Sequence, residues 1–264
     1  MRTIICPTDF SNTAINATKY AAAIAEKIDA KLHLIHVMHV PVVDVNSSAN
    51  VLTTLMDTQK EASDLKLKVE IERLSKNTNC EIEFASQFGL AVDVIISESK
   101  KLKANLLVMG TNGASNVFDQ LLGTVSFGVA KRSEVPVIVV PPASQFTGLK
   151  RIAFADDHKE SLNEQREFLY HLTSGLESKI DLISVDVRDE GEYEEEIICN
   201  EGGVRQVCVW SDQIQNGIEQ FTERNNIELL AIKRHHRTFF EELFHKSTTK
   251  EVLNKTKIPV LIFN

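Results

Sequence analysis

Three glycines and two hydroxyl residues near the middle of the chain have the types and spacing needed to bind phosphate. The glycines are Gly110, Gly113 and Gly123, and Gly123 is followed by Thr124 and Ser126. Glycine lets the backbone turn sharply and approach a ligand with no Cβ in the way. The segment after Gly123 is expected to begin a helix, whose free amides and positive dipole end favour phosphate oxygens. The pattern therefore predicts a nucleotide-binding site.

Other interpretations of these residues stay open at this point. The P-loop pattern GxxxxGK[ST] does not occur, and no lysine is placed to hold a β- or γ-phosphate. The glycine fingerprint of hydride-transferring enzymes belongs after a first strand, whereas Gly110 follows a later one. The glycines could also mark a tight turn alone. Asp9 could contact a ligand or only cap the first helix.

No residue pattern points to catalysis or to a bound metal. His33, His36 and His39 alternate along an expected strand, so His36 faces away from the other two and a zinc site would lack convergent ligands. Cys6 and Cys208 lie in expected buried strands and are interpreted as core residues. No Ser-His-Asp or Cys-His arrangement stands out. We therefore name no catalytic residue and no metal ligand, and we expect binding rather than turnover.

An alternation of strands and helices must position these residues. Short β-branched apolar runs separated by helical periods indicate a parallel sheet covered on both faces. In the first half of the chain the expected strands are 3–6, 32–40, 81–88, 105–109 and 135–140. The expected helices are 12–30, 51–77, 91–102 and 124–133, the first with Ser11 as its N-cap.

The second half repeats this series. The expected strands are 151–155, 181–187, 204–210, 229–232 and 259–263, and the expected helices are 161–176, 212–224 and 241–254. Residues 109–140 overlay residues 232–263 without a gap at an offset of 123, whereas the starts of the two copies overlay at an offset of 148. The second copy thus lacks about 25 residues, which we place after its second strand, where the acidic stretch 189–196 replaces a long helix.

The repeat predicts an α/β protein of two tandem doubly wound domains, the second shortened. We place the domains at residues 1–143 and 149–264. With 264 residues, both can bury a sizeable core.

Composition excludes several classes of protein. Lys and Arg number 29 against 37 Asp and Glu, and the net charge of −8 argues against a general nucleic-acid binder. The excess of acids is local, with a net charge of −1 over residues 1–145 and −7 over residues 146–264. No apolar run is long enough to span a membrane, and no signal peptide is recognisable. The four cysteines show no CxxC spacing, so we expect reduced thiols and a cytoplasmic protein.

Together with the glycine motif, two short segments carry a resemblance to a known family. Residues 7–9 (Pro-Thr-Asp) follow the first strand, and residues 36–37 (His-Val) end the second. With them the whole chain resembles the universal stress proteins in their tandem two-domain form. The resemblance implies five parallel strands in the order 3-2-1-4-5 in each domain. It also implies that the fifth strands, 135–140 and 259–263, pair within the chain as a pseudo-dimer, with a further homodimer as an option.

The glycine motif is that of the ATP-binding members, and the resemblance therefore implies a site for adenine nucleotide. The residues assigned to it, from the adenine and ribose end to the phosphates, are Pro7, Asp9, Val37, Met109, Gly110, Gly113, Gly123, Thr124, Val125 and Ser126. A Mg²⁺ ion carried by the triphosphate would need no protein cage of its own.

The second copy departs from this motif, and we expect no ATP site of the same kind there. The replacements are Lys233 for Gly110, His236 for Gly113, Lys246 for Gly123 and Ser247 for Thr124. Side chains would fill the space of a backbone contact, and only Asp157 and Ser247 would still suit a ligand. The basic cluster 233–237 could hold an anionic group, pair with the acidic stretch 189–196, or be solvated.

The sequence therefore predicts a stress-response or signalling module that binds ATP in its first domain, with the second as a degenerate partner. Two alternatives are a nucleotide-independent interaction scaffold and a slow ATPase or nucleotidyl transferase. We expect no nucleic acid and no membrane among the partners.

Overall fold

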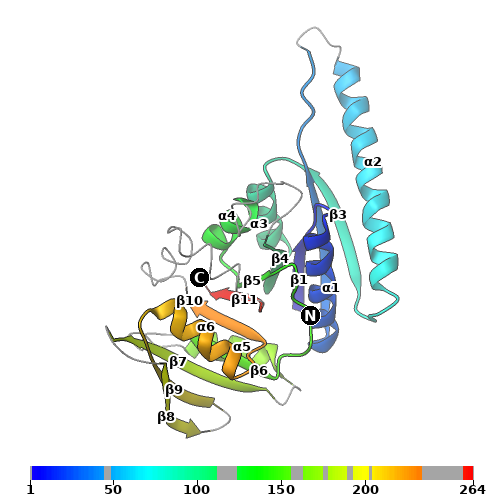
Figure 1. Ribbon diagram of the computed structural model, residues 1–264. Helices are drawn as coiled ribbons and strands as arrows, with labels where there is room; N and C mark the ends of the chain where they lie inside the picture. The colour runs from blue at the N-terminus through cyan, green and yellow to red at the C-terminus, as the bar shows by residue number, and fades with distance from the viewer. Residues whose placement is uncertain are drawn as a thin grey trace.

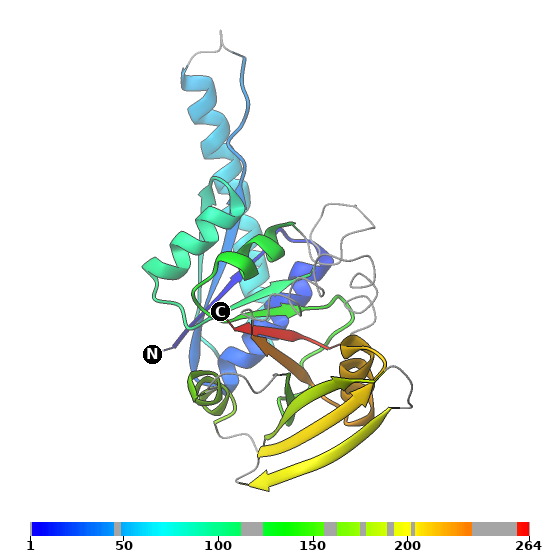
Figure 2. The same ribbon diagram turned by 90° about the vertical axis from the view of Figure 1, so that its left-hand side faces the viewer.

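The structure, a computed structural model, describes residues 2–44, 49–111, 124–155, 163–174, 178–188, 193–201, 204–233 and 258–263. These residues form one eleven-stranded sheet in the order β3-β2-β1-β4-β5-β11-β10-β6-β7-β9-β8, with helices on both faces (Figures 1 and 2). We call β1 to β5 the N-terminal half and β6 to β11 the C-terminal half.

The N-terminal half alternates strands and helices as the periodicity predicts. Its elements are β1 (Arg2–Pro7), α1 (Asn12–Lys27), β2 (Ala30–Met38), α2 (Ala49–Leu74), β3 (Ile82–Phe88), α3 (Ala91–Lys101), β4 (Leu106–Gly110), α4 (Thr124–Arg132) and β5 (Val137–Val140). Ser11 is the N-cap of α1, and its side chain accepts a hydrogen bond from the Ala14 amide at 3.2 Å. The strands are parallel in the expected order 3-2-1-4-5.

The C-terminal half repeats the arrangement with one addition. Its elements are β6 (Arg151–Ala155), α5 (Asn163–Leu172), β7 (Lys179–Val187), β8 (Glu194–Glu201), β9 (Val204–Ser211), α6 (Ile214–Arg224), β10 (Leu229–Lys233) and β11 (Val260–Phe263). The strands β9-β7-β6-β10-β11 again follow the order 3-2-1-4-5 and are parallel. The expected helix 241–254 lies outside the described residues.

The added strand is β8, and it corrects the expectation of five parallel strands in this half. It pairs antiparallel with β9 and forms the edge of the sheet. Residues 194–196 of the acidic stretch lie on it. The place of the long helix of the first half, α2, is thus taken by an edge strand that includes part of the acidic stretch.

Alternation along the strands divides the core between the two faces of the sheet. On one face Ile4, Leu32 and Leu106 lie beneath α1 and α2, and the same cluster continues to Leu169 of α5. On the other face the buried residues of the strands pack beneath α3, α4 and α6. Continuously apolar strands are typical of such doubly covered sheets.

The two halves join edge to edge. Strand β5 pairs antiparallel with β11, with Val139 opposite Val260 and Ile138 opposite Leu261. All four residues of each strand are buried. Because the ladder is antiparallel, the strands of the C-terminal half end at the opposite edge of the sheet from β1 and β4. Among the described residues, no helix is both long and apolar enough to cross a bilayer.

Candidate functional site

The candidate site lies where the strand order of the N-terminal half reverses. From β1 the chain proceeds to β2 on one side, whereas from β4 it proceeds to β5 on the other. Ile5 of β1 pairs with Leu107 of β4, and each strand ends within three residues of that pair, so the two carboxyl ends lie side by side. Open α/β sheets bind ligands at such a switch point. Pro7 is the last residue of β1, and Gly110 is the last of β4.

The turn after β1 is fixed by its own polar groups. The Thr8 amide donates to the Ile35 carbonyl at 2.9 Å, and the Thr8 Oγ1 accepts from the Phe10 amide at 3.1 Å. The exposed carboxylate of Asp9 accepts from the Ser11 amide at 3.0 Å. Asp9 therefore does shape the turn before α1, while its carboxylate stays at the surface beside the switch point.

A histidine contact that the sequence did not predict joins β2 to this turn. The Nδ1 of His36 lies 2.7 Å from the Thr8 carbonyl oxygen, and its ring lies 4.6 Å from the Phe10 ring. Val37, the next residue, is half-buried and packs into the core on the α3 and α4 face. Strand alternation predicts that the two side chains point to opposite faces. The backbone acceptor, 28 residues away, could not be predicted.

Gly110 is required by a close approach between β4 and α1. A Cβ at this position would lie 2.8 Å from the Thr13 Cγ2 and 3.0 Å from the Thr13 carbonyl oxygen. Contacts that short do not occur, so any other residue would push the end of β4 away from α1. The Gly110 carbonyl in turn accepts a hydrogen bond from the Ser126 hydroxyl at 2.7 Å. This bond holds the first turn of α4 against the end of β4.

The structure brings together most of the predicted site residues that it describes. Thr124 is exposed at the first position of α4, whereas Val125 and Ser126 turn inward. The Met109 side chain is buried in the core, so only its backbone can face the site. Gly113 and Gly123 lie outside the described residues.

The C-terminal half carries a lysine at the position of Gly110. Gly110 pairs with Val140, and Lys233 pairs with Phe263 at the same register of β10 and β11. The predicted offset of 123 is therefore confirmed, and the side chain that replaces glycine is a long cation. The counterparts Asp157, His236, Lys246 and Ser247 lie outside the described residues, as do residues 234–237 of the basic cluster.

The comparisons with known proteins agree with this duplicated architecture. The family model described as "Universal stress protein family" matches residues 1–141 and again residues 155–264. The chain belongs to the universal stress protein family.

Individual relatives cover either one half of the chain or all of it. The chain is 31% identical to universal stress protein MJ0531 of Methanocaldococcus jannaschii over 52% of this chain and 80% of that protein. It is 25% identical to Slr1230 of Synechocystis over the full length of both. A universal stress protein structure from Archaeoglobus fulgidus superposes with a TM-score of 0.67 at 17% identity, covering 99% of this chain and 96% of that one. The similarity to the Archaeoglobus fulgidus structure shows that the two chains share the two-copy fold.

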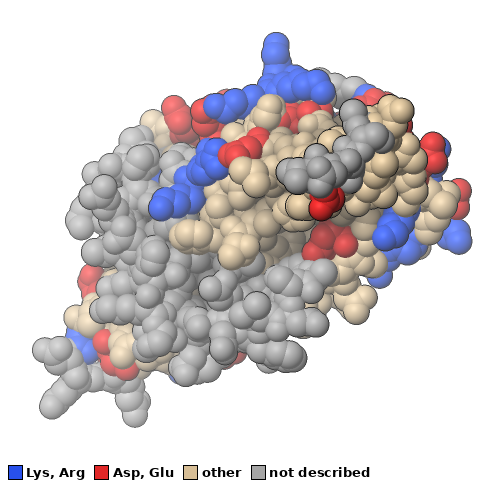
Figure 3. Space-filling view, turned by 90° about the horizontal axis from the view of Figure 1, so that it is seen from above, with Lys and Arg blue, Asp and Glu red and all other residues tan. Residues whose placement is uncertain are grey.

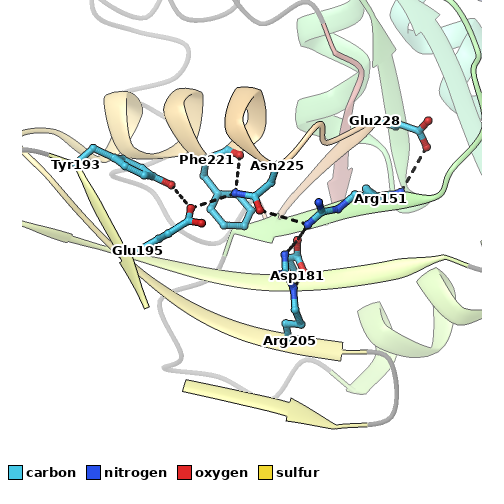
Figure 4. Close-up of polar contacts among 8 residues, drawn as sticks. All are labelled: Arg151, Asp181, Tyr193, Glu195, Arg205, Phe221, Asn225 and Glu228. Carbon is cyan, nitrogen blue, oxygen red and sulfur yellow. Dashed lines mark hydrogen bonds and ion pairs between the residues drawn. The ribbon is translucent and has the colours of Figure 1, made fainter. Parts of the chain in front are cut away.

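A polar network in the C-terminal half is centred on the buried carboxylate of Asp181 and extends to the exposed Glu195 (Figure 4). Asp181 is fully buried and accepts from Arg205 Nε at 2.6 Å and Nη2 at 2.7 Å, and from Arg151 Nη2 at 3.0 Å. The network continues from Arg151 to Asn225 at 3.4 Å, and from Asn225 to Glu195 of β8 at 3.1 Å. Glu195 also accepts from the Tyr193 hydroxyl at 2.6 Å. These bonds tie β8 to α6 and to the sheet.

At the corresponding positions of the N-terminal half, the second strand carries a histidine and the third strand carries the acid. Asp181 pairs with Arg205 between β7 and β9, and His33 pairs with Glu83 between β2 and β3. His33 is buried, and neither ring nitrogen has a hydrogen-bond partner among the described residues. Desolvation lowers the pKa of His33, against the opposing effect of the carboxylates of Glu98 and Glu83. The half with the candidate site thus keeps a neutral imidazole where the other half buries an ion pair.

Cysteine and metal chemistry find no support in the described residues. All four cysteines are free, and burial raises the pKa of the Cys6, Cys80 and Cys208 thiols, so they are poor nucleophiles. Within the described ranges no three His, Cys, Asp or Glu side chains converge as a metal site would need.

A small cavity of about 140 Å³ lies at the other edge of the N-terminal sheet, against α5. Arg2 at its rim donates to the His171 carbonyl at 3.0 Å. Its lining residues are Arg2, Ile4, Ile28, Asn105, Leu106, Phe168, His171 and Leu172. The cavity therefore belongs to the packing between the halves and not to the switch point.

Proposed function

We propose that the N-terminal half binds ATP at the carboxyl ends of β1 and β4, and that this binding serves the protein's role in the stress response. The bond from Ser126 to the Gly110 carbonyl carries the proposal, because it fixes the start of α4 at the switch point. Free amides at a helix N-terminus favour phosphate oxygens. Thr124, exposed at that start, supplies a hydroxyl donor.

The remaining predicted residues complete the proposed site. Pro7, Asp9 and Val37 line its adenine and ribose end, and the backbone of Met109 and Gly110 approaches the ribose. Val125 contributes its amide, and Gly113 and Gly123 lie in the segment proposed to wrap the phosphates. A Mg²⁺ ion would arrive with the triphosphate and would not need a protein cage.

The mixture of positive and negative surface charge supports recognition of the phosphates by backbone amides rather than by a basic surface. On the side of the molecule where β1 and β2 end, Lys and Arg are interspersed with Asp and Glu over the described atoms (Figure 3). Mixed charges of this kind give little net attraction for a polyanion. The C-terminal half, with Lys233 in place of Gly110, acts in this proposal as an intrachain partner through β5 and β11 and holds no second ATP.

A single charge at the start of α4 tests the proposal. Thr124→Glu places a carboxylate at a helix N-terminus, which favours the helix but repels phosphate. Calorimetric titration is expected to show ATP binding weakened by about tenfold or more, which corresponds to roughly 1.4 kcal/mol.

The matched control is Gln213→Glu, which makes a comparable change at the N-cap of α6 in the C-terminal half. ATP affinity of this variant should equal that of the wild type. Equal affinity in all three proteins would show that ATP, if bound, lies elsewhere, and absence of binding to the wild type would refute the proposed function.

A further inference from the structure

Helix α2 carries a buried stripe that faces the protein and a second, largely apolar stripe that is exposed. The inner stripe comprises Ser63, Leu67, Glu70 and Leu74, all of them buried. Glu70 lies in this stripe because it accepts a hydrogen bond from Thr18 of α1 and pairs with Arg73. The inner stripe thus accounts for how α2 packs on α1 and the sheet.

The second stripe faces solvent. It comprises Val51, Leu55, Thr58, Ala62, Leu65 and Val69, and each of these residues is exposed. Leu65 is 64% exposed and Val69 is 58% exposed. The steps between successive members alternate between four and three residues, which is the heptad spacing of a coiled-coil seam. We call these six residues the outer stripe.

The position of α2 leaves the outer stripe accessible. The helix has 26 residues, which corresponds to about 39 Å, and its amino-terminal part projects beyond the sheet in both ribbon views (Figures 1 and 2). Exposed Val40 and Val42 lie on the segment that leads from β2 toward it. An apolar stripe on a helix is expected to be buried, and the monomer leaves the outer stripe exposed.

We propose that the outer stripe is a dimerisation surface, on which α2 of a second copy of this chain packs antiparallel. In this register Ala62 lies opposite Leu65 of the partner subunit, and Thr58 lies opposite Val69 of the partner subunit. The four central members of the outer stripe, residues 58, 62, 65 and 69, therefore form the seam, in which each small residue meets a large one. Each contact occurs twice, as a two-fold interface requires.

Charge complementarity favours a second copy as the occupant. Glu61 and Lys68 flank the outer stripe on the same side, and both are exposed. In the antiparallel register Glu61 meets Lys68 of the partner subunit, and the pair recurs through the two-fold axis. This surface is separate from β5 and β11, which pair with each other inside the chain. The proposal is also independent of nucleotide binding.

Sedimentation equilibrium of the full chain over a wide concentration range tests the proposal. The wild type is expected to dimerise, and Leu65→Lys is expected to weaken the dimer by about tenfold or more, because a charged side chain would replace an apolar one at the centre of the seam. Leu65 is exposed in the monomer, so circular dichroism and thermal unfolding should show the fold retained. Asp57→Lys adds a lysine on the same helix beside the stripe and should leave the dimer unchanged.

A charge exchange identifies the register. Glu61→Lys and Lys68→Glu should each weaken dimerisation, because each places like charges opposite one another, and the double variant should restore it. A wild type that stays monomeric at every concentration would overturn the proposal, as would a dimer that Leu65→Lys leaves intact. Failure of the double variant to recover would overturn the antiparallel register.

Discussion

At the scale of single residues, the two halves differ at a pair of equivalent positions on their second and third strands. The buried carboxylate of Asp181 lies between two arginines, whereas the equivalent His33 lies beside Glu83 at 3.9 Å. A buried charge without its partner is costly, so replacing either Asp181 or Arg205 alone would destabilise the C-terminal half. In the N-terminal half Glu83 is exposed, and the lowered pKa of His33 favours the neutral imidazole. The anionic position is on the second strand in one half and on the third strand in the other. Both halves therefore keep a contact between the second and third strands, which is an ion pair of Asp181 with Arg205 in one half and a contact of His33 with Glu83 in the other.

Removing the carboxylate of Asp181 should therefore be among the costliest single changes in the C-terminal half. We expect Asp181→Ala to lower the free energy of unfolding by about 3 kcal/mol, at the lower end for a broken buried pair because both arginines keep some solvent contact. Urea unfolding measures the loss. Glu195→Ala removes a carboxylate at the exposed end of the same network and should cost under about 1 kcal/mol. Equal effects of the two variants would contradict this account.

At the scale of elements, the close packing of α3 on α4 positions the candidate site. Gly128 of α4 faces Val92 of α3, and a Cβ at Gly128 would lie 2.8 Å from the Val92 Cγ2. This contact fixes how near α4 lies to α3. Through the bond from Ser126 to Gly110 it also fixes where the helix begins relative to the end of β4.

The effect of Gly128→Ala should change sign with the residue at position 92. In the wild type the added methyl group overpacks the helix contact, at a cost of about 1–3 kcal/mol, which exceeds the gain of about 1 kcal/mol from replacing a helical glycine. In a Val92→Ala background the clash is gone, so Gly128→Ala should stabilise the protein. Thermal unfolding of the four proteins measures this coupling, and a substitution effect of the same sign in both backgrounds would contradict it.

Elements that bury an apolar face were predictable from the sequence, and β8 was not. The regular strands and described helices match the expected ranges within a few residues. Short apolar runs mark the buried strands, and the helical spacing of apolar residues marks the helices between them. In β8, by contrast, residues 194–198 are exposed, including Ile197 and Ile198. Its extended form is set by pairing with β9, a partner that composition does not reveal. The run of acids at residues 194–196 shows no alternation of apolar and polar residues that would predict a strand.

At the scale of the whole molecule, strand register locates the deletion. Ile4 pairs with Leu32 as Ile152 pairs with Ile180, an offset of 148 on both strands. The offset is smaller for the third strands. Val37 pairs with Gln87 in the N-terminal half and Val185 pairs with Val209 in the C-terminal half, so the third strands correspond at an offset of 122. The fourth and fifth strands are related at 123. The residues missing from the C-terminal half therefore lie between its second and third strands, as predicted. Between the third and fourth strands the C-terminal half has one residue more than the N-terminal half.

The candidate site was predictable only in part. Gly110, Thr124 and Ser126 were predicted as site residues from their types and spacing, because glycine lets a backbone approach a ligand closely and hydroxyl groups can donate to phosphate. The contacts of Thr13 with Gly110 and of His36 with Thr8 depend on tertiary distances between segments far apart in sequence. No local sequence pattern predicts these two contacts.

The central claim is that one half binds adenine nucleotide and the other does not. Native mass spectrometry of the intact chain, titrated with ATP and Mg²⁺, tests it most directly. The account predicts saturation at one ATP per chain, because Lys233 replaces the glycine at the second switch point. Two ATP molecules per chain, or none at saturating concentration, would contradict it.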